Sequence, residues 1–154
     1  EQIVKTVQII QATWINVIGN YIFGLPGDTK DSMQRTLDLA LALKCEWANF
    51  YPAMAFPGSQ LYEKALANGW RLPESWAGYA PLGYECVPLE TESLSSEEII
   101  AFRDEAFVRY FTDLGWQWSV KTKFNYPALA EIDHITATPI KRKILGHKPN
   151  FVQM

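Results

Sequence analysis

The chain has 154 residues, of which 48% are hydrophobic, and its formal net charge at pH 7 is −3. This length is typical of one domain, and the apolar fraction is large enough for a sizeable core. The small acidic excess gives no electrostatic reason to expect a nucleic-acid partner or a membrane surface. No apolar run reaches the roughly 20 residues that cross a bilayer, so we expect no membrane span.

Cysteine and histidine content limits metal and redox chemistry. The two cysteines, Cys45 and Cys86, are too few for an iron–sulfur cluster held by cysteines or for a four-cysteine zinc site. A disulfide between them is compatible with the sequence, but nothing else indicates an oxidising compartment, so we expect a reduced, cytoplasmic setting. His134 and His147 lack neighbours at metal-ligand spacing and are expected at the surface, so no metal ligands are predicted.

The first part of the chain alternates between helical and strand patterns. Residues 2–13 have the periodicity of an amphipathic helix that begins directly after Glu1, as in a chain entered midway through a fold. Residues 15–23 are nearly all apolar and predict a strand that is buried on both faces. The Gly-Leu-Pro-Gly sequence of residues 24–27 then ends this strand.

A second helix and a second strand follow. Asp28 or Thr29 can cap a helix that runs to about Lys44, and residues 47–51 predict the strand. Residues 59–69 predict a short helix that a serine caps and a glycine ends. The expected inward stripe of the longer helix is Met33, Leu37, Ala40 and Leu41.

Alternation of helices and strands predicts parallel strands joined by crossover connections. A complete (β/α)8 barrel needs about 250 residues, which is more than this chain contains. The predicted fold class is therefore α/β: a partial TIM-like barrel with parallel strands, followed by a mainly helical C-terminal region. The predicted boundary separates residues 1–69, the last part of the barrel, from residues 70–154, a long loop followed by helices.

The second half of the chain begins with an irregular loop. Residues 70–92 are rich in proline, glycine and aromatic residues, and a loop of this length in a compact domain is more often functional than idle. Its aromatic side chains can line an apolar substrate pocket or pack the loop down, and the sequence leaves both interpretations open. These side chains are Trp70, Trp76 and Tyr79.

Helix signals dominate the remainder of the chain. Residues 95–98 form a capping box that predicts a helix start, with Leu94 and Ile99 as its hydrophobic staple. Residues 114–126 are ambiguous between strand and helix. A later helix is expected to start near Pro127 and to end or kink at a second proline. The two prolines are Pro127 and Pro139. The basic run after them, Lys141, Arg142 and Lys143, is most simply a solvated helix face.

An ordered set of short motifs runs along the chain. Residues 19–29 read Gly-Asn-Tyr-Ile-Phe-Gly-Leu-Pro-Gly-Asp-Thr, and further matches fall at residues 49–51, 57–62, 102–107 and 141–146. Together they resemble radical S-adenosylmethionine (SAM) enzymes, particularly those with an N-terminal cobalamin-binding domain. One family motif, Gly-x-Ile-x-Gly-x-x-Glu, departs here at both ends and reads Asn20-x-Ile22-x-Gly24-x-x-Gly27.

The resemblance implies an enzyme as the intact parent. Such a parent would bind SAM, a [4Fe-4S] cluster and, in the cobalamin type, cobalamin, and would start radical methylation, cyclisation or rearrangement of a small-molecule substrate. The family's Cys-x-x-x-Cys-x-x-Cys loop is absent from this sequence. The chain alone is therefore expected to be inactive and to need the missing N-terminal part of the same protein.

The resemblance also implies cofactor-binding residues at the ends of the two predicted strands. A glycine lets the backbone approach adenine closely, an isoleucine can pack on the ring, and strand-end amides can bond its edge. From the residues alone, an ordinary strand-to-helix turn explains the same segment. Cys86 is a candidate hydrogen-atom donor, although packing as a small buried hydrophobe is the favoured interpretation. The cofactor-binding residues implied are Asn20, Ile22, Gly24, Leu25, Pro26, Tyr51 and Pro52.

Two alternatives remain open at this level. The first is a radical SAM enzyme without cobalamin, related to anaerobic coproporphyrinogen oxidase. The second is a non-catalytic binding or assembly module. Sequence upstream of Glu1 would distinguish the cobalamin-type enzyme from the cobalamin-free enzyme, because only the cobalamin type has a cobalamin domain there.

Overall fold

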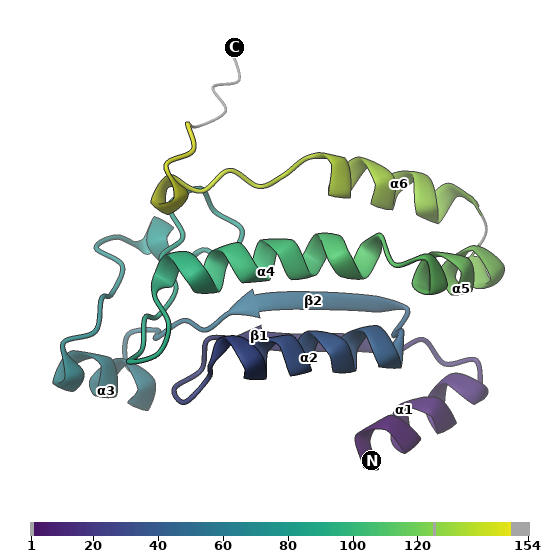
Figure 1. Ribbon diagram of the computed structural model, residues 1–154, viewed down its shortest axis with the longest axis horizontal. Helices are drawn as coiled ribbons and strands as arrows, with labels where there is room; N and C mark the ends of the chain where they lie inside the picture. Colours follow the sequence, from purple (N-terminus) through teal and green to yellow (C-terminus); the bar gives the residue numbers. More distant parts are fainter. Residues whose placement is uncertain (1, 125, 149–154) are drawn as a thin grey trace.

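The computed structural model describes residues 2–124 and 126–148, and in these residues two parallel strands lie among helices (Figure 1). Short 3₁₀ turns fall in the long loop (η1, Trp76–Tyr79) and near the C-terminus (η2, Lys143–Leu145). The other elements, in chain order, are α1 (Gln2–Ala12), β1 (Ile18–Phe23), α2 (Lys30–Leu43), β2 (Trp47–Pro52), α3 (Gln60–Asn68), α4 (Ser96–Phe111), α5 (Leu114–Phe124) and α6 (Tyr126–Ala137).

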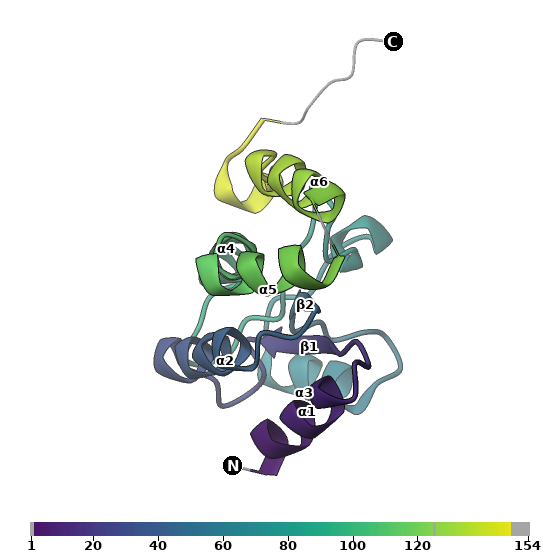
Figure 2. The ribbon, with the colours of Figure 1, turned by 90° about the vertical axis from the view of Figure 1, so that its right-hand side faces the viewer.

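The two strands pair in parallel, which confirms the predicted strand direction. The register runs from Ile18 opposite Trp47 to Phe23 opposite Pro52. α2 packs against β1 and α4 packs against β2, so both helices cover the same face of the sheet (Figures 1 and 2). α6 lies beyond α4, which makes the molecule layered from sheet to outer helix.

The prediction that the first strand is buried on both faces is wrong. Buried and exposed side chains alternate along β1, and Ile18 and Ile22 are 59% and 47% exposed. The composition of the strand alone cannot distinguish these cases, because an apolar side chain on the outer face has the same sequence signal whether or not a neighbour covers it. In the described residues this face of the sheet stays open.

The predicted partial TIM-like barrel is also not supported. The described chain has a mixed α/β fold with a two-stranded sheet and mostly helices. After α3, residues 70–92 form an irregular loop with one 3₁₀ turn and supply no further strand. α4 then packs on the covered face of β2, and in the described residues no strand pairs with the outer edge of β2.

One hydrophobic core joins the covered face of the sheet to the helices. Phe50 lies at its centre, with ring centroids 5.3 to 5.8 Å from those of Tyr21, Phe23 and Tyr110. Stacked and edge-to-face rings at these distances stabilise a core beyond the area that they bury. The core contains residues from both sides of the predicted 69/70 boundary, and this boundary stays a prediction.

The predicted helix starts are confirmed in atomic detail. Thr29, Ser59 and Ser95 each occupy the N-cap position and accept a backbone N–H bond, and Thr29 and Ser95 form reciprocal capping boxes. α3 ends at Gly69, as predicted. The predicted stripe of α2 is confirmed too, because Met33, Leu37 and Ala40 are buried and Leu41 packs on the core.

The C-terminal half resolves the remaining expectations. The ambiguous segment is helical as α5, and α6 ends before Pro139 as predicted. The solvated-helix interpretation of the basic run is wrong, because Arg142 is 0% exposed and precedes η2 outside any helix. None of the helices in the described ranges has the length and apolarity that a bilayer crossing requires.

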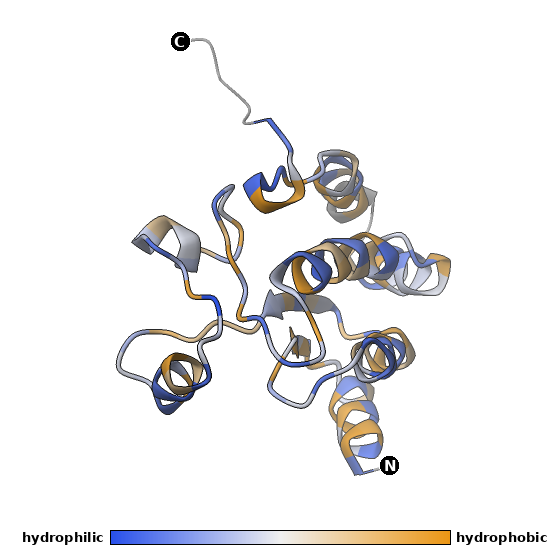
Figure 3. Cartoon of the chain, turned by 60° about the vertical axis from the view of Figure 1, so that its left-hand side comes forward, coloured by the Kyte–Doolittle hydropathy of each residue, from blue (hydrophilic) through white to orange (hydrophobic). Residues whose placement is uncertain are grey.

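The helix predicted for residues 2–13 is present as α1, but none of its residues is buried. Its hydrophobic positions form a visible band (Figure 3), and Ile3 and Ile9 are 63% and 67% exposed.

Candidate functional site

The open face of the sheet carries part of the predicted cofactor site. Ile22 and Tyr51 are register partners near the strand ends, and their side chains are 47% and 39% exposed. Beside them, Asn49 donates from Nδ2 to Asn20 Oδ1 (3.0 Å) and accepts from Trp47 Nε1 (3.1 Å). These bonds orient the Asn20 amide next to an apolar surface on the same face.

The turn after β1 is held by a carboxylate. Asp28 Oδ2 accepts from the backbone N–H groups of Gly24 and Leu25, both at 3.0 Å. The strand-end amides that were expected to bond the edge of adenine are therefore engaged within the chain. Gly24 has φ +83°, and a Cβ at this position would lie 2.6 Å from Ile99 Cδ1. The glycine is thus required for the close approach of α4.

The structure brings only some of the predicted cofactor residues onto one surface. Leu25 is 43% exposed beside the turn, and Pro26 is half-buried. Gly24 and Pro52 are buried, and Pro52 lies on the helix-covered face of β2. Those that share the open face are Asn20, Ile22 and Tyr51.

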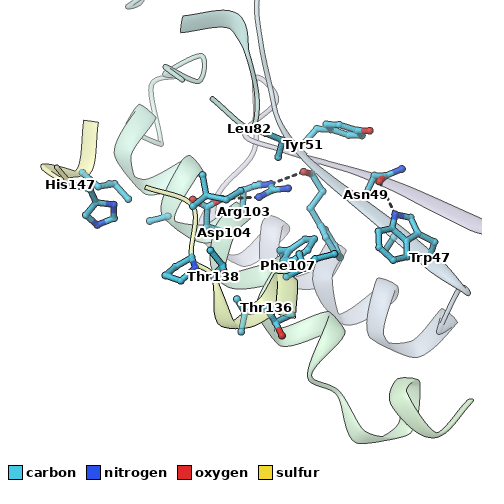
Figure 4. Close-up of a pocket in the computed structure, with 18 residues that line it drawn as sticks. Trp47, Asn49, Tyr51, Leu82, Arg103, Asp104, Phe107, Thr136, Thr138 and His147 are labelled. Atoms are coloured by element: carbon cyan, nitrogen blue, oxygen red, sulfur yellow. Dashed lines mark hydrogen bonds and ion pairs between the residues drawn. The ribbon is translucent and has the colours of Figure 1, made fainter. Parts of the chain in front are cut away.

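A separate cavity of about 500 Å³ lies along the outer edge of β2 (Figure 4). Of the predicted cofactor residues, Tyr51 lines it. Its walls come mainly from β2, from α4 and from the chain between α6 and η2. Side chains such as Trp47, Phe107 and Ile140 make the walls mostly apolar.

A charged cluster forms one side of this cavity. Asp104 accepts a bidentate pair of bonds from Arg142 Nε and Nη2, at 2.8 and 2.7 Å, and a third bond from Arg103 Nη1 at 2.8 Å. Arg103 Nε also donates to the Phe50 carbonyl at 2.7 Å. Arg142 reaches back to the loop, where Nη1 donates to Pro81 O at 2.9 Å.

Sequence reasoning did not identify this cluster as a site. One signal was present, because Arg103 falls between Ile99 and Ala106 on the buried stripe of α4 and is 4% exposed. A charged residue on an apolar helix face needs a buried partner. The contribution of Arg142 had no comparable signal, since its neighbours Lys141 and Lys143 are exposed.

Cys86 is completely buried near this cluster. Burial is the main cause that raises the pKa of its thiol to about 11, and Asp104 raises it further while Arg142 and Arg103 oppose the shift. The thiol is therefore protonated at neutral pH and poorly reactive. Cys86 and Cys45 are both free, and each is buried, as the packing interpretation of these residues expects.

The other candidates have simple surroundings. Tyr79 stacks on Phe56 with ring centroids 5.7 Å apart, Trp70 packs on a small core cluster, and Trp76 is 77% exposed. His134 and His147 are exposed, as predicted. Within residues 2–124 and 126–148, no group of three His, Cys, Asp or Glu side chains is arranged to hold a metal ion.

Comparison with known proteins gives one informative relative. An uncharacterized methyltransferase of Pyrococcus horikoshii is 24% identical over 111 residues, which cover 72% of this chain and 24% of that protein. The chain thus spans about a quarter of the relative's length. No protein-family model matches the chain.

The predicted membership of the radical SAM enzymes is wrong. No model of that family matches, the relative that is found is described only as a methyltransferase, and the described sheet has two strands instead of a barrel. The similarity is consistent with enzymatic activity and with chemistry related to SAM at a coarse level.

Proposed function

We propose that the chain is part of a methyltransferase that uses SAM, and that the strand-end surface contacts the adenosine part of this cofactor. The observation that carries the proposal is the similarity to the methyltransferase of Pyrococcus horikoshii. Because the match covers 24% of that protein, the activity belongs to a longer polypeptide to which this chain contributes one portion.

The residues at the strand ends fit part of such a cofactor. Ile22 and Tyr51 form an exposed apolar surface on which a flat adenine ring can lie. Asn20 Oδ1 accepts from Asn49, and in the described residues Asn20 Nδ2 has no acceptor, so it can donate to a ligand on this face. Leu25 is exposed on the turn after β1, while Gly24, Pro26 and Pro52 shape the turn and the strand end.

When bound, SAM supplies a methyl group on a positively charged sulfur. The described residues would bind and orient the adenosine and exclude water from one face of its ring. The proposal includes no iron–sulfur cluster and no cobalamin, because neither the methyltransferase similarity nor the described side chains support them.

The remaining exposed apolar surface supports a larger protein. Ile18 and Ile22 on the open sheet face, and Ile3 and Ile9 on α1, are all more than 45% exposed. Exposed apolar side chains that gather on one face of a sheet or helix often mark an interface. We therefore expect further polypeptide of the same protein to cover the open face and to complete the cofactor site.

Methyl-selective NMR can test cofactor contact in this chain. We expect millimolar SAM to shift the Ile22 δ1 methyl signal, because adenine would stack on it, while Ile18 at the other end of the same face stays unchanged. The affinity should be weak, since most of the site belongs to the longer protein. Substitution Ile22→Ser should abolish the shifts of neighbouring signals, and Ile18→Ser should preserve them. Equal shifts at both isoleucines, or none at Ile22, would contradict the proposal.

A further inference from the structure

The cavity beside β2 has an excess of positive charge that the chain itself does not neutralise. Two guanidinium groups, those of Arg103 and Arg142, share the single carboxylate of Asp104. The side chains of the two arginines are 5% and 0% exposed. A buried net charge of +1 is costly unless an anion approaches it.

Arg103 keeps bonding capacity on the side of the cavity. Its described bonds use Nε and Nη1, and in the described ranges Nη2 has no acceptor. No fully buried side-chain nitrogen in the same ranges lacks a partner, so Nη2 keeps some accessible surface, and Arg103 is a lining residue of the cavity. The guanidinium carbon also lies 5.4 Å from the centre of the Phe107 ring, which fixes its plane.

The rest of the cavity is suited to an apolar molecule. Trp47, Phe107 and Val108 contribute apolar surface, and the volume of about 500 Å³ lies in the range of small-molecule sites. Arg103 and Asp104 supply the charged groups of the lining. The backbone of β2 also presents its outer edge to this space. Trp47 N donates to Val17 O just before β1 and Ala53 N donates to Phe23 O of β1, and the backbone groups of the residues between them alternate in direction.

We infer that this cavity binds a small aromatic or aliphatic carboxylate, with the carboxylate at Arg103 Nη2 and the apolar body between β2, α4 and the chain after α6. This inference does not rest on the proposed methyl transfer. The cavity shares Tyr51 with the proposed adenosine surface, but its charged groups carry a net charge of +1 and favour an anion.

A matched pair of probes tests the charge requirement. Naphthalene-2-carboxylate and naphthalene-2-carboxamide have nearly the same shape and differ by one negative charge. Titration of the chain by calorimetry or ligand-observed NMR should show the carboxylate binding about tenfold more tightly, because it alone can form a charge-assisted bond with Arg103. Equal binding of the two probes, or no binding of the carboxylate at millimolar concentration, would overturn the inference.

Substitutions on α4 test whether Arg103 contacts the carboxylate of the probe. Arg103→Met should weaken carboxylate binding about tenfold and remove the preference over the amide. Arg109→Met on the same helix should leave both affinities unchanged, because Arg109 bonds to Gln34 and Glu105 and does not line the cavity. A retained preference in Arg103→Met would exclude Arg103 as the anion contact.

A second variant tests the site in case Arg103→Met does not fold. Ala101 is exposed and lines the cavity, so Ala101→Trp should fill it and abolish binding of both probes. Glu105→Trp introduces the same side chain at an exposed position of α4 outside the cavity lining and should preserve binding. Binding that survives Ala101→Trp would place the probe elsewhere and refute the site.

Discussion

Gly24 combines two restrictions that can be separated by substitution. Its φ of +83° disfavours any side chain, and its missing Cβ makes room for Ile99. Gly27 has a similar φ of +92°, but a Cβ there would meet nothing within 4 Å. A non-glycine residue in this region costs about 1–2 kcal/mol, and forced overpacking adds about 1–3 kcal/mol.

We therefore expect Gly24→Ala to lower the free energy of unfolding by about 2–5 kcal/mol and Gly27→Ala by about 1–2 kcal/mol. Urea unfolding followed by circular dichroism measures both values. A similar loss in the two variants would mean that α4 does not press on the turn as the structure indicates.

Glu46 links the start of β1 to α5. Its Oε2 accepts from the Val17 N–H at 2.8 Å and its Oε1 from Lys123 Nζ at 2.8 Å. Burial raises the pKa of this carboxyl, but the bonds from Lys123 and Val17 outweigh burial, and the net shift is downward from 4.5. A lowered pKa in the folded state contributes stability above pH 4.5, which is lost as the pH falls through the folded pKa.

Glu46→Gln should therefore lower the free energy of unfolding at pH 7 by about 1–2 kcal/mol, since bonds to a charged group are replaced by neutral ones. The difference in free energy of unfolding between wild type and variant should become smaller below pH 4.5. Urea titrations at pH 7 and pH 3.5 measure it, with Glu92→Gln as the exposed control. A gap that is constant with pH would show that ionisation of Glu46 does not contribute.

At the scale of elements, the features that sequence predicts correctly are local. The N-caps Thr29, Ser59 and Ser95 act on backbone groups within three or four residues, so their signals are complete in a short window. The burial of β1 depends on what covers each face, and neither neighbour is encoded in the strand. Ile22 illustrates this limit, because its apolar character predicted burial and the structure exposes it.

The start of α4 provides an element-scale test. Ser95 accepts the Glu98 N–H at 3.1 Å, and Glu98 accepts the Ser95 N–H at 3.0 Å. Ser95→Ala should lower the free energy of unfolding by about 1 kcal/mol, because an N–H of the first turn loses its acceptor. Ser93→Ala, at an exposed position outside the helix, is the control and should change it by less than about 0.5 kcal/mol. Equal losses would indicate that the capping box does not stabilise α4.

At the scale of the molecule, the cavity is closed by contacts between distant segments. Arg142 is 38 residues from Asp104 and 61 from Pro81, and Tyr84 donates from its hydroxyl to the His147 carbonyl, 63 residues away. Motif and periodicity arguments do not reach such separations. For this reason the sequence could indicate Arg103, a charged residue on the buried stripe of α4, but not its link to Arg142 in another segment. The strand-end residues were named from a family resemblance that the comparisons overturn, and their role stays a prediction.

Asp104 is the residue on which this long-range closure depends. It balances two buried guanidinium groups, and Asp104→Asn removes the negative charge while it keeps the size of the side chain. Breaking a buried ion pair by neutralising one partner costs about 3–5 kcal/mol, because the remaining charges stay desolvated. We expect a loss at the lower end, about 3 kcal/mol, since Asp104 itself is 23% exposed and water can approach it.

The matched control is Glu105→Gln on the neighbouring position of α4. Glu105 is 62% exposed and pairs with Arg109 one turn away at 3.4 Å, a type of contact that contributes about 0.5 kcal/mol or less. Urea unfolding compares the two variants, and amide hydrogen exchange should show faster exchange at Lys143, whose N–H bonds to Tyr84 O, in Asp104→Asn only. Similar stability of both variants would mean that apolar contacts hold the segment after α6 in place and that the ion pairs of Asp104 do not stabilise its packing against α4.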